Sequence, residues 1–196
     1  MRLPTTALTT LLREVRARIA RELPGGRVIV VVDGTASRAV REFADGLAGV
    51  FDEVGVAVFR ASAGDFLLPR AVRESQRAAR TDARERHDID IDTMRRVLVD
   101  PFRDGGQTSA TTGFQLTAWD ADRDAPAPAR WVTGPADAAL VVDGPLLGHP
   151  ELCGLWDFSV WVDAGGARSG APEAAASLVV DSADPARPEI RRNDRH

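Results

Sequence analysis

Residues 27–41 have the sequence context of a phosphate-binding loop without the residues that bind phosphate. Such a loop has the pattern G-x-x-x-x-G-K-[ST] between a strand and a helix, because glycines let backbone amides surround the phosphates, lysine supplies charge and the hydroxyl holds Mg²⁺. Gly34 stands at the first glycine. Ala39, Val40 and Arg41 stand at the second glycine, the lysine and the hydroxyl residue. No other lysine can substitute, since all 25 basic residues are arginine.

Polar side chains in the same segment still offer a route to anion binding. Ser37, Arg38 and Arg41 lie at the expected start of a helix, and guanidinium groups pair well with phosphate. The alternative is that both arginines are ordinary surface residues. A left-handed turn at Ala39 would be strained by its Cβ, so we expect a loop that has collapsed or changed shape.

Other reactive side chains give weaker indications. Asp88, Asp90 and Asp92 alternate, which fits either a cation site or, as we favour, a solvated loop that leads to a helix cap at Asp92. The histidines have no metal-ligand spacing, and we expect Cys153 to be a buried thiol. The tryptophans are expected in packing, with stacking on a nucleobase as the alternative. The histidines are His87, His149 and His196, and the tryptophans are Trp119, Trp131, Trp156 and Trp161.

Hydrophobic patterning predicts the elements that position these residues. Residues 8–19 have the spacing of an amphipathic helix, and the uninterrupted β-branched run 28–32 is typical of a parallel strand covered on both faces. Ser37 can cap the next helix, whose apolar stripe is Val40, Phe43, Ala44, Leu47 and Val50. A strand over 54–59 then completes a strand-helix-strand unit, which indicates an α/β fold.

Further elements follow along the chain. Residues 69–86 are rich in arginine and predict an exposed helix or a mobile segment. Asp92 is expected to cap a helix that ends at Pro101, and residues 114–119 read as a strand with alternating faces. The last predicted strands are 138–142, 158–162 and 178–181.

Length and charge bound the class of protein. A chain of 196 residues that is 44% hydrophobic can bury one core, so we expect a single domain with an N-terminal helical segment (1–26), an α/β core (27–190) and a tail (191–196). The formal net charge of −4 gives no reason to expect nucleic acid or an anionic membrane as a partner. Without an apolar run of spanning length or the apolar core of a signal peptide, the expected location is the cytoplasm.

Several separated stretches together resemble one family. They are 30–34 (Val-Val-Val-Asp-Gly), 62–66 (Ser-Ala-Gly-Asp-Phe) with 69–70 (Pro-Arg), 88–92 (Asp-Ile-Asp-Ile-Asp), 100–102 (Asp-Pro-Phe) with 105–106 (Gly-Gly), 119–120 (Trp-Asp), 140–147 (Leu-Val-Val-Asp-Gly-Pro-Leu-Leu), 150–152 (Pro-Glu-Leu), 156–157 (Trp-Asp), 179–181 (Val-Val-Asp) and 184–185 (Asp-Pro). In this order they resemble the uridine kinase group of P-loop nucleoside kinases, as found in bacteria, over residues 28–190. The resemblance implies an α/β fold with a mainly parallel sheet flanked by helices.

The departures from this family fall on its catalytic positions. The resemblance implies an aspartate base at position 64, where this chain has Gly64, with Asp65 one residue further along. The family's arginine-bearing lid between the last two strands is replaced by the short connection 165–172. Asp143 stands where the family places an acid near the metal, although acids at strand ends also cap turns before glycine.

We therefore expect a degenerate nucleoside kinase-like protein, without a lid subdomain and without efficient phosphoryl transfer, that binds a nucleoside, a nucleotide, another small ligand or a protein partner. One alternative is an active nucleoside (uridine-like) or small-metabolite kinase that uses ATP and Mg²⁺, with Arg38 or Arg41 in place of the lysine and Asp65 as the base. The other is a noncatalytic scaffold subunit, for which a homo-oligomer is one arrangement.

Overall fold

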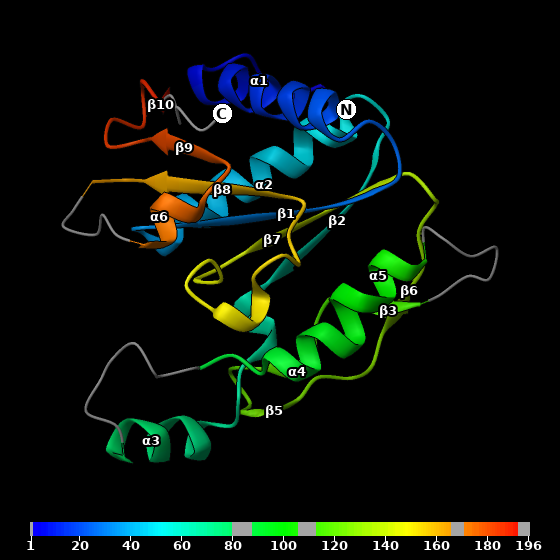
Figure 1. Ribbon diagram of the computed structural model, residues 1–196, viewed down its shortest axis with the longest axis vertical. Coiled ribbons are helices and arrows are strands. Elements are labelled where there is room, and N and C mark those ends of the chain that lie inside the picture. The colour runs from blue at the N-terminus through cyan, green and yellow to red at the C-terminus, as the bar shows by residue number, and fades with distance from the viewer. Residues whose placement is uncertain (1, 80–87, 106–112, 166–170, 192–196) are drawn as a thin grey trace.

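The computed structural model describes residues 2–79, 88–105, 113–165 and 171–191, and its centre is a six-stranded sheet (Figure 1). The sheet order is β10-β9-β8-β1-β7-β2, and the strands pair in parallel except for the antiparallel pair β9 and β10. The strand bounds are Arg27–Gly34 for β1, Ala57–Ser62 for β2, Ala138–Asp143 for β7, Phe158–Asp163 for β8, Leu178–Asp181 for β9 and Glu189–Arg191 for β10. The predicted mainly parallel α/β fold is confirmed.

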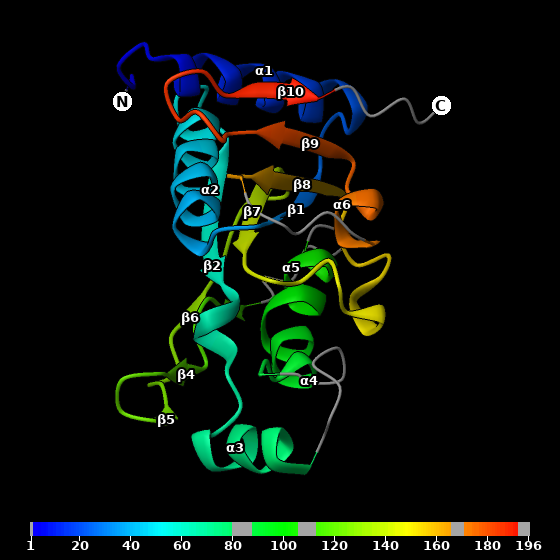
Figure 2. The same ribbon diagram turned by 90° about the vertical axis from the view of Figure 1, so that its left-hand side faces the viewer.

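Two long helices cover one face of the sheet. They are α1 (Ala7–Glu22) and α2 (Ser37–Asp52), which lie together on the same side of the strands (Figures 1 and 2). Val30 and Val32 of β1 point to this side, while Ile29 and Val31 point to the other, so β1 is buried on both faces as its uninterrupted apolar run predicts. The predicted apolar stripe of α2 is buried in full.

Short helical segments cover the opposite face. α4 (Ile91–Met94), the π-helical turn η3 (Arg95–Val99) and α5 (Asp100–Asp104) follow one another without a break. Small paired strands lie beside them: β3 (Phe114–Gln115) pairs with β6 (Trp131–Val132), and β4 (Trp119–Asp120) with β5 (Ala125–Pro126). The remaining segments are η1 (Ala63–Phe66), α3 (Arg70–Ala79), η4 (Pro150–Leu152) and α6 (Ala171–Ala175). Both views show α3 apart from the sheet.

Several predicted boundaries were wrong. The second strand is 57–62 instead of 54–59, because Gly55 adopts a positive φ of 76° in a turn that leaves Val54 51% exposed. The predicted strand 114–119 is two separate short strands. The helix after Asp90 was predicted to end at Pro101 but continues through it. The backbone amide of Asp100 donates to the carbonyl of Arg95 in a widened π turn just before the proline.

Three side-chain predictions were also wrong. Asp90, not Asp92, caps α4, because its carboxylate accepts the Thr93 amide at 2.9 Å. Ser37 is the first residue of α2 and Ala36 occupies the N-cap position, so this helix has no side-chain cap. Cys153 is exposed, since it directly follows the surface turn η4.

Part of the predicted connection 165–172 lies outside the described residues, as do residues 80–87 of the arginine-rich segment. Residues 171–175 form the short helix α6, and residues 70–79 form α3, in line with the predicted exposed helix. None of the helices in the described residues combines the length and the apolar composition needed to cross a membrane.

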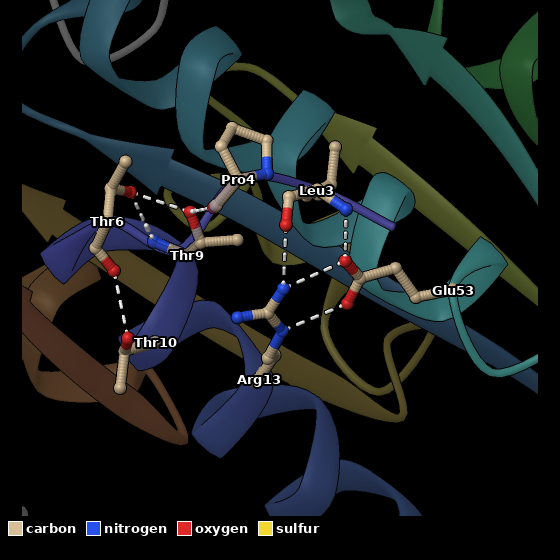
Figure 3. Close-up of polar contacts among 7 residues, drawn as sticks. All are labelled: Leu3, Pro4, Thr6, Thr9, Thr10, Arg13 and Glu53. Carbon is tan, nitrogen blue, oxygen red and sulfur yellow. Dashed lines mark hydrogen bonds and ion pairs between the residues drawn. The ribbon is translucent and has the colours of Figure 1, made fainter. Parts of the chain in front are cut away.

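The N-terminal segment is fastened to the end of α2 by one polar network (Figure 3). Arg13 of α1 donates to both carboxylate oxygens of Glu53, at 3.0 and 2.9 Å, and to the Leu3 carbonyl at 3.1 Å. The Leu3 amide donates to Glu53 in return. The Arg13 hydrogen bonds, followed by the Leu3 amide, lower the pKa of Glu53 from 4.5 to about 2. Thr6 caps α1 by accepting the Thr9 amide at 3.0 Å.

Candidate functional site: a cleft at the carboxyl ends of β1, β7 and β2

Two adjoining cavities open where three parallel strands end. One has a volume of about 360 Å³ and lies over the β1–α2 turn, and the other has a volume of about 450 Å³ and lies beside β2 and η1. Four residues line both: Arg41, Ser62, Gly64 and Asp143. We refer to the two cavities together as the cleft. Open α/β sheets bind their ligands at this edge, so the cleft is the candidate functional site.

The turn from β1 to α2 is shorter than a phosphate-binding loop. β1 ends at Gly34 and α2 begins at Ser37, so only Thr35 and Ala36 connect them. Thr35 is bound to the end of β8, because its amide donates to the Val162 carbonyl at 3.1 Å and its hydroxyl accepts the Ala164 amide at 2.9 Å. A Cβ on Gly34 would lie 2.1 Å from the Val162 carbonyl oxygen, which explains the glycine. The expected change of loop shape is therefore seen as a tight turn.

Asp33, near the end of β1, stabilises this turn. Its side chain is buried and accepts the Gly34 amide at 2.6 Å and the Leu147 amide at 2.9 Å. Burial raises the pKa of the Asp33 carboxyl, and hydrogen bonds from the amides of Leu147, Gly34 and Leu146 oppose that increase. This carboxylate joins the end of β1 to the loop after β7, which is a structural role.

The residues at the degenerate positions lie in the first turns of α2. Val40 is 3% exposed and packs into the core between α2 and the sheet, and Ala39 lies partly buried against the same core. Arg41 lines both cavities. Ser37 lines only the cavity over the turn, whereas Arg38 lines neither cavity, because its side chain is 90% exposed and pairs with Glu42 at 2.7 Å. The structure thus brings Gly34, Ser37 and Arg41 to the cleft and leaves Arg38 outside it.

Asp143 ends β7 inside the cleft and is already paired. Its side chain is 6% exposed, one oxygen accepts Arg60 Nη2 at 2.8 Å, and the other accepts the Ser62 hydroxyl at 3.3 Å. Both partners come from β2, whose Ser62 lies directly beside Asp143 in the strand register. Asp143 also precedes Gly144, whose φ of 138° and close approach to Ala63 require glycine. Asp143 therefore fits both interpretations: it precedes a turn that requires glycine, and its charged side chain lines the cleft.

Asp65 lies at the other end of the cleft, in η1. Burial raises the pKa of its carboxyl, Asp143 raises it further, and the Ser62 amide, Arg41 and Arg60 lower it. Gly64 lines both cavities, and a Cβ there would meet nothing closer than Ser62 Oγ at 3.6 Å. Position 64 could therefore carry a side chain into the cleft, and Asp65 supplies the available carboxylate beside it.

The other predicted candidates lie away from the cleft. Asp88 pairs with Arg77 at 2.6 Å, while Asp90 caps α4, and the described part of the chain holds no cluster of three or more His, Cys, Asp and Glu side chains suited to a metal ion. None of the four tryptophans lines either cavity of the cleft. Trp161 is buried, as expected for packing, whereas Trp131 is 59% exposed. His87 and His196 lie outside the described residues.

Arg60 is the site residue that sequence reasoning missed. The strand predicted over 54–59 stopped one residue before it, although a charged residue within the run 56–63, two positions before Ser62, was a signal that a partner is needed. Arg60 lies on β2 beside Val141, which is two residues before Asp143 on β7 and therefore on the same face of the sheet. Its pairing depends on the register of two strands that are distant in sequence, so no local pattern predicts it.

Comparisons with known proteins agree on the fold. No family model and no curated protein sequence matches the chain. Among solved structures, it is similar to a possible uridine kinase from Bacillus stearothermophilus, with a TM-score of 0.60, 18% identity, and coverage of 80% of this chain and 81% of that one. It is also similar to a proposed fructose transport system kinase from Silicibacter sp. TM1040, with a TM-score of 0.57, 20% identity, and coverage of 88% and 79%.

A third similar structure is D-glycerate 3-kinase from Cryptococcus neoformans, with a TM-score of 0.51, 10% identity, and coverage of 81% of this chain and 73% of that one. At these identities the likeness concerns the fold. The chain has the mostly parallel, helix-flanked sheet of P-loop kinase-like proteins.

Proposed function

We propose that this protein binds a nucleoside-type or other small ligand in the cleft without transferring a phosphoryl group. The observation that carries the proposal is Val40. Phosphoryl transfer is catalysed mainly by positioned charge around the phosphoryl oxygens, and the loop lysine is a central part of that charge. Here the lysine position holds a valine that is 3% exposed and packed into the core. No lysine exists elsewhere in the chain to replace it.

The shape of the β1–α2 turn supports the same conclusion. A phosphate-binding loop surrounds phosphate with successive backbone amides. In this turn the Gly34 amide donates to Asp33 and the Thr35 amide donates to Val162, so neither is available to a ligand. The cleft itself remains large enough for a small molecule, with cavities of about 360 and 450 Å³.

Two assays on the purified protein test this proposal. A phosphoryl-transfer assay with ATP, Mg²⁺ and uridine or cytidine should give no product. Thermal unfolding with uridine, UMP, ATP or GTP should show stabilisation by at least one of them. At about 100 times its dissociation constant a ligand adds roughly 2.7 kcal/mol, which raises the unfolding temperature of a chain of this size by roughly 5–10 °C.

A cleft-filling variant provides the control. Gly64→Leu places a side chain into both cavities without a backbone clash, so it should remove the ligand-induced shift. Ala78→Leu adds the same side chain on the exposed α3 and should retain it. Measurable phosphorylation would overturn the absence of catalysis, and unchanged unfolding curves with every ligand would overturn binding.

A second candidate function is a kinase that uses Arg41 and Asp65. It is favoured by one observation: both side chains line the same cavity, and the pKa of Asp65 is raised by burial, as suits a general base. In that case activity would rise with pH as Asp65 loses its proton, and both Arg41→Ala and Asp65→Asn would abolish it. Activity that persists in either variant would exclude this candidate.

A further inference from the structure

The fold to which this chain is similar is that of kinases that bind a divalent cation. In P-loop enzymes a Ser or Thr of the loop and an acid on a neighbouring strand hold Mg²⁺. The corresponding positions here are Arg41 and Asp143. Arg41 has no metal-ligating atom, because a guanidinium group carries only donors. The fit of a metal therefore depends on Asp143.

The carboxylate of Asp143 already has a cation beside it. Arg60 Nη2 donates to its Oδ1 at 2.8 Å, and the Ser62 hydroxyl donates to its Oδ2 at 3.3 Å. With its side chain 6% exposed, Asp143 lies in a site where an ion pair is screened only weakly by water. Because the Arg60 guanidinium and the Ser62 hydroxyl occupy both carboxylate oxygens, and because the guanidinium is positively charged, the site does not fit Mg²⁺, which needs carboxylate oxygens that are free to coordinate.

Arg60 is held in this place by all of its donors. Nε and Nη2 donate to Asp45 Oδ1 at 2.9 and 2.8 Å, and Nη1 donates to the carbonyls of Ala61 and Val141 at 2.9 and 2.8 Å. With the bond to Asp143, each of the five N–H groups of the guanidinium has an acceptor. An ammonium or a freely moving side chain would not be fixed in this way, so the positive charge is a permanent part of the cleft.

We infer that the guanidinium of Arg60 takes the place of the divalent cation, so that Asp143 binds no metal and ligand binding in the cleft is independent of Mg²⁺. The metal part of this inference stands on the contacts of Arg60 alone. The ligand part rests on the proposed binding function. Metal binding is measured without any ligand, so failure of the inference is distinguishable from failure of the proposed function.

Manganese binding to the full chain, followed by the electron paramagnetic resonance signal of free Mn²⁺, tests the inference. The wild-type protein and Asp143→Asn should bind Mn²⁺ equally weakly. Arg60→Met frees the carboxylate, so Mn²⁺ should bind at least roughly tenfold more tightly, which corresponds to about 1.4 kcal/mol. The double variant Arg60→Met/Asp143→Asn should lose this gain.

Arg41→Met is the matched control, because it removes a positive charge from the same cleft without releasing a hydrogen bond to Asp143. Its Mn²⁺ affinity should remain close to that of the wild type. A site in the wild-type protein that Asp143→Asn removes would overturn the inference, and this comparison holds even if Arg60→Met does not fold. An equal gain in Arg41→Met, or no gain in folded Arg60→Met, would overturn it as well.

Discussion

Arg60 and Arg38 both pair with a carboxylate, but the two pairs differ in their exposure to water. The Arg60 side chain is 24% exposed and that of its partner Asp143 is 6% exposed, whereas Arg38 is 90% exposed. Removing one partner of a buried pair leaves an uncompensated charge. We therefore predict that Arg60→Met lowers the free energy of unfolding by roughly 3 kcal/mol, as measured by urea denaturation.

Arg38→Met makes the same chemical change on the surface and is the control for this prediction. Its partner Glu42 is 57% exposed and remains hydrated when the arginine is removed, so the unfolding midpoint should stay where it is in the wild type. If both substitutions have equal effects, the cleft does not shield the Arg60–Asp143 pair from solvent.

Two glycines of the cleft should respond differently to alanine. A Cβ on Gly34 would lie 2.1 Å from the Val162 carbonyl oxygen, which can move only with the backbone of β8. We predict that Gly34→Ala destabilises the protein by roughly 1–3 kcal/mol, as for other overpacked sites. In Gly64→Ala the nearest atom is 3.6 Å away, so its thermal unfolding temperature should remain close to that of the wild type. If Gly34→Ala and Gly64→Ala lose the same amount of stability, the β1–α2 turn can move to accommodate the added Cβ and the prediction is wrong.

The residues of the site were predictable from sequence to the extent that they lie in local motifs. Gly34, Ser37, Arg41 and Asp143 follow predicted strands or begin a predicted helix, and all of them line the cleft. The sequence could not show that Arg41 lines the cleft and Arg38 does not, because the direction of a side chain on the first turn of a helix depends on where that helix begins. Ala36 at the N-cap, instead of the predicted Ser37, changes that direction.

At the scale of elements, α1 is held to α2 by a charged contact as well as by apolar packing. Glu53 follows α2, and hydrogen bonds from Arg13 of α1 lower its pKa to about 2 from 4.5. Because the folded state lowers this pKa, the contact stabilises the protein fully above about pH 4.5, and the stabilisation is lost as the pH falls towards about 2. The difference in unfolding free energy between wild type and Glu53→Gln should shrink over this range.

Urea denaturation at a series of pH values measures that difference. Glu42→Gln, which removes one negative charge from the exposed side of α2, controls for the change in net charge. A difference between wild type and Glu53→Gln that stays constant on acidification would mean that the carboxylate contributes no charge-dependent contact.

Helices and strands with a clear pattern of apolar residues were predicted correctly. Short strands that exist only because they pair with a distant strand were not. α1, α2, β7 and β9 follow from helical spacing or from short apolar runs between turns. β10 has only three residues and pairs only with β9, so its own sequence is too short to predict a strand. The break between β3 and β4 likewise depends on two different partner strands, β6 and β5.

At the scale of the whole molecule, β1 and β7 join two hydrophobic clusters. Val30, Val32 and Val141 belong to the cluster under α1 and α2, while Ile29 and Leu140 belong to the cluster on the opposite face. Neighbouring residues of one strand cannot leave one cluster without disturbing the other, since they share a backbone. We therefore propose that the α/β core unfolds as one cooperative domain.

This proposal predicts the behaviour of substitutions on each face. Phe43 and Phe102 are fully buried in different clusters, so Phe43→Ala and Phe102→Ala should each cost roughly 3–5 kcal/mol. The fluorescence of Trp161 on β8 and of Trp119 on β4, each measured with the other tryptophans replaced by phenylalanine, should report the same midpoint as far-UV circular dichroism. Neither tryptophan belongs to the cluster under α1 and α2, whereas far-UV circular dichroism reports mainly on these two long helices. If Phe102→Ala shifts the tryptophan transitions and leaves the circular dichroism transition unchanged, the two faces unfold separately and the single-domain proposal fails.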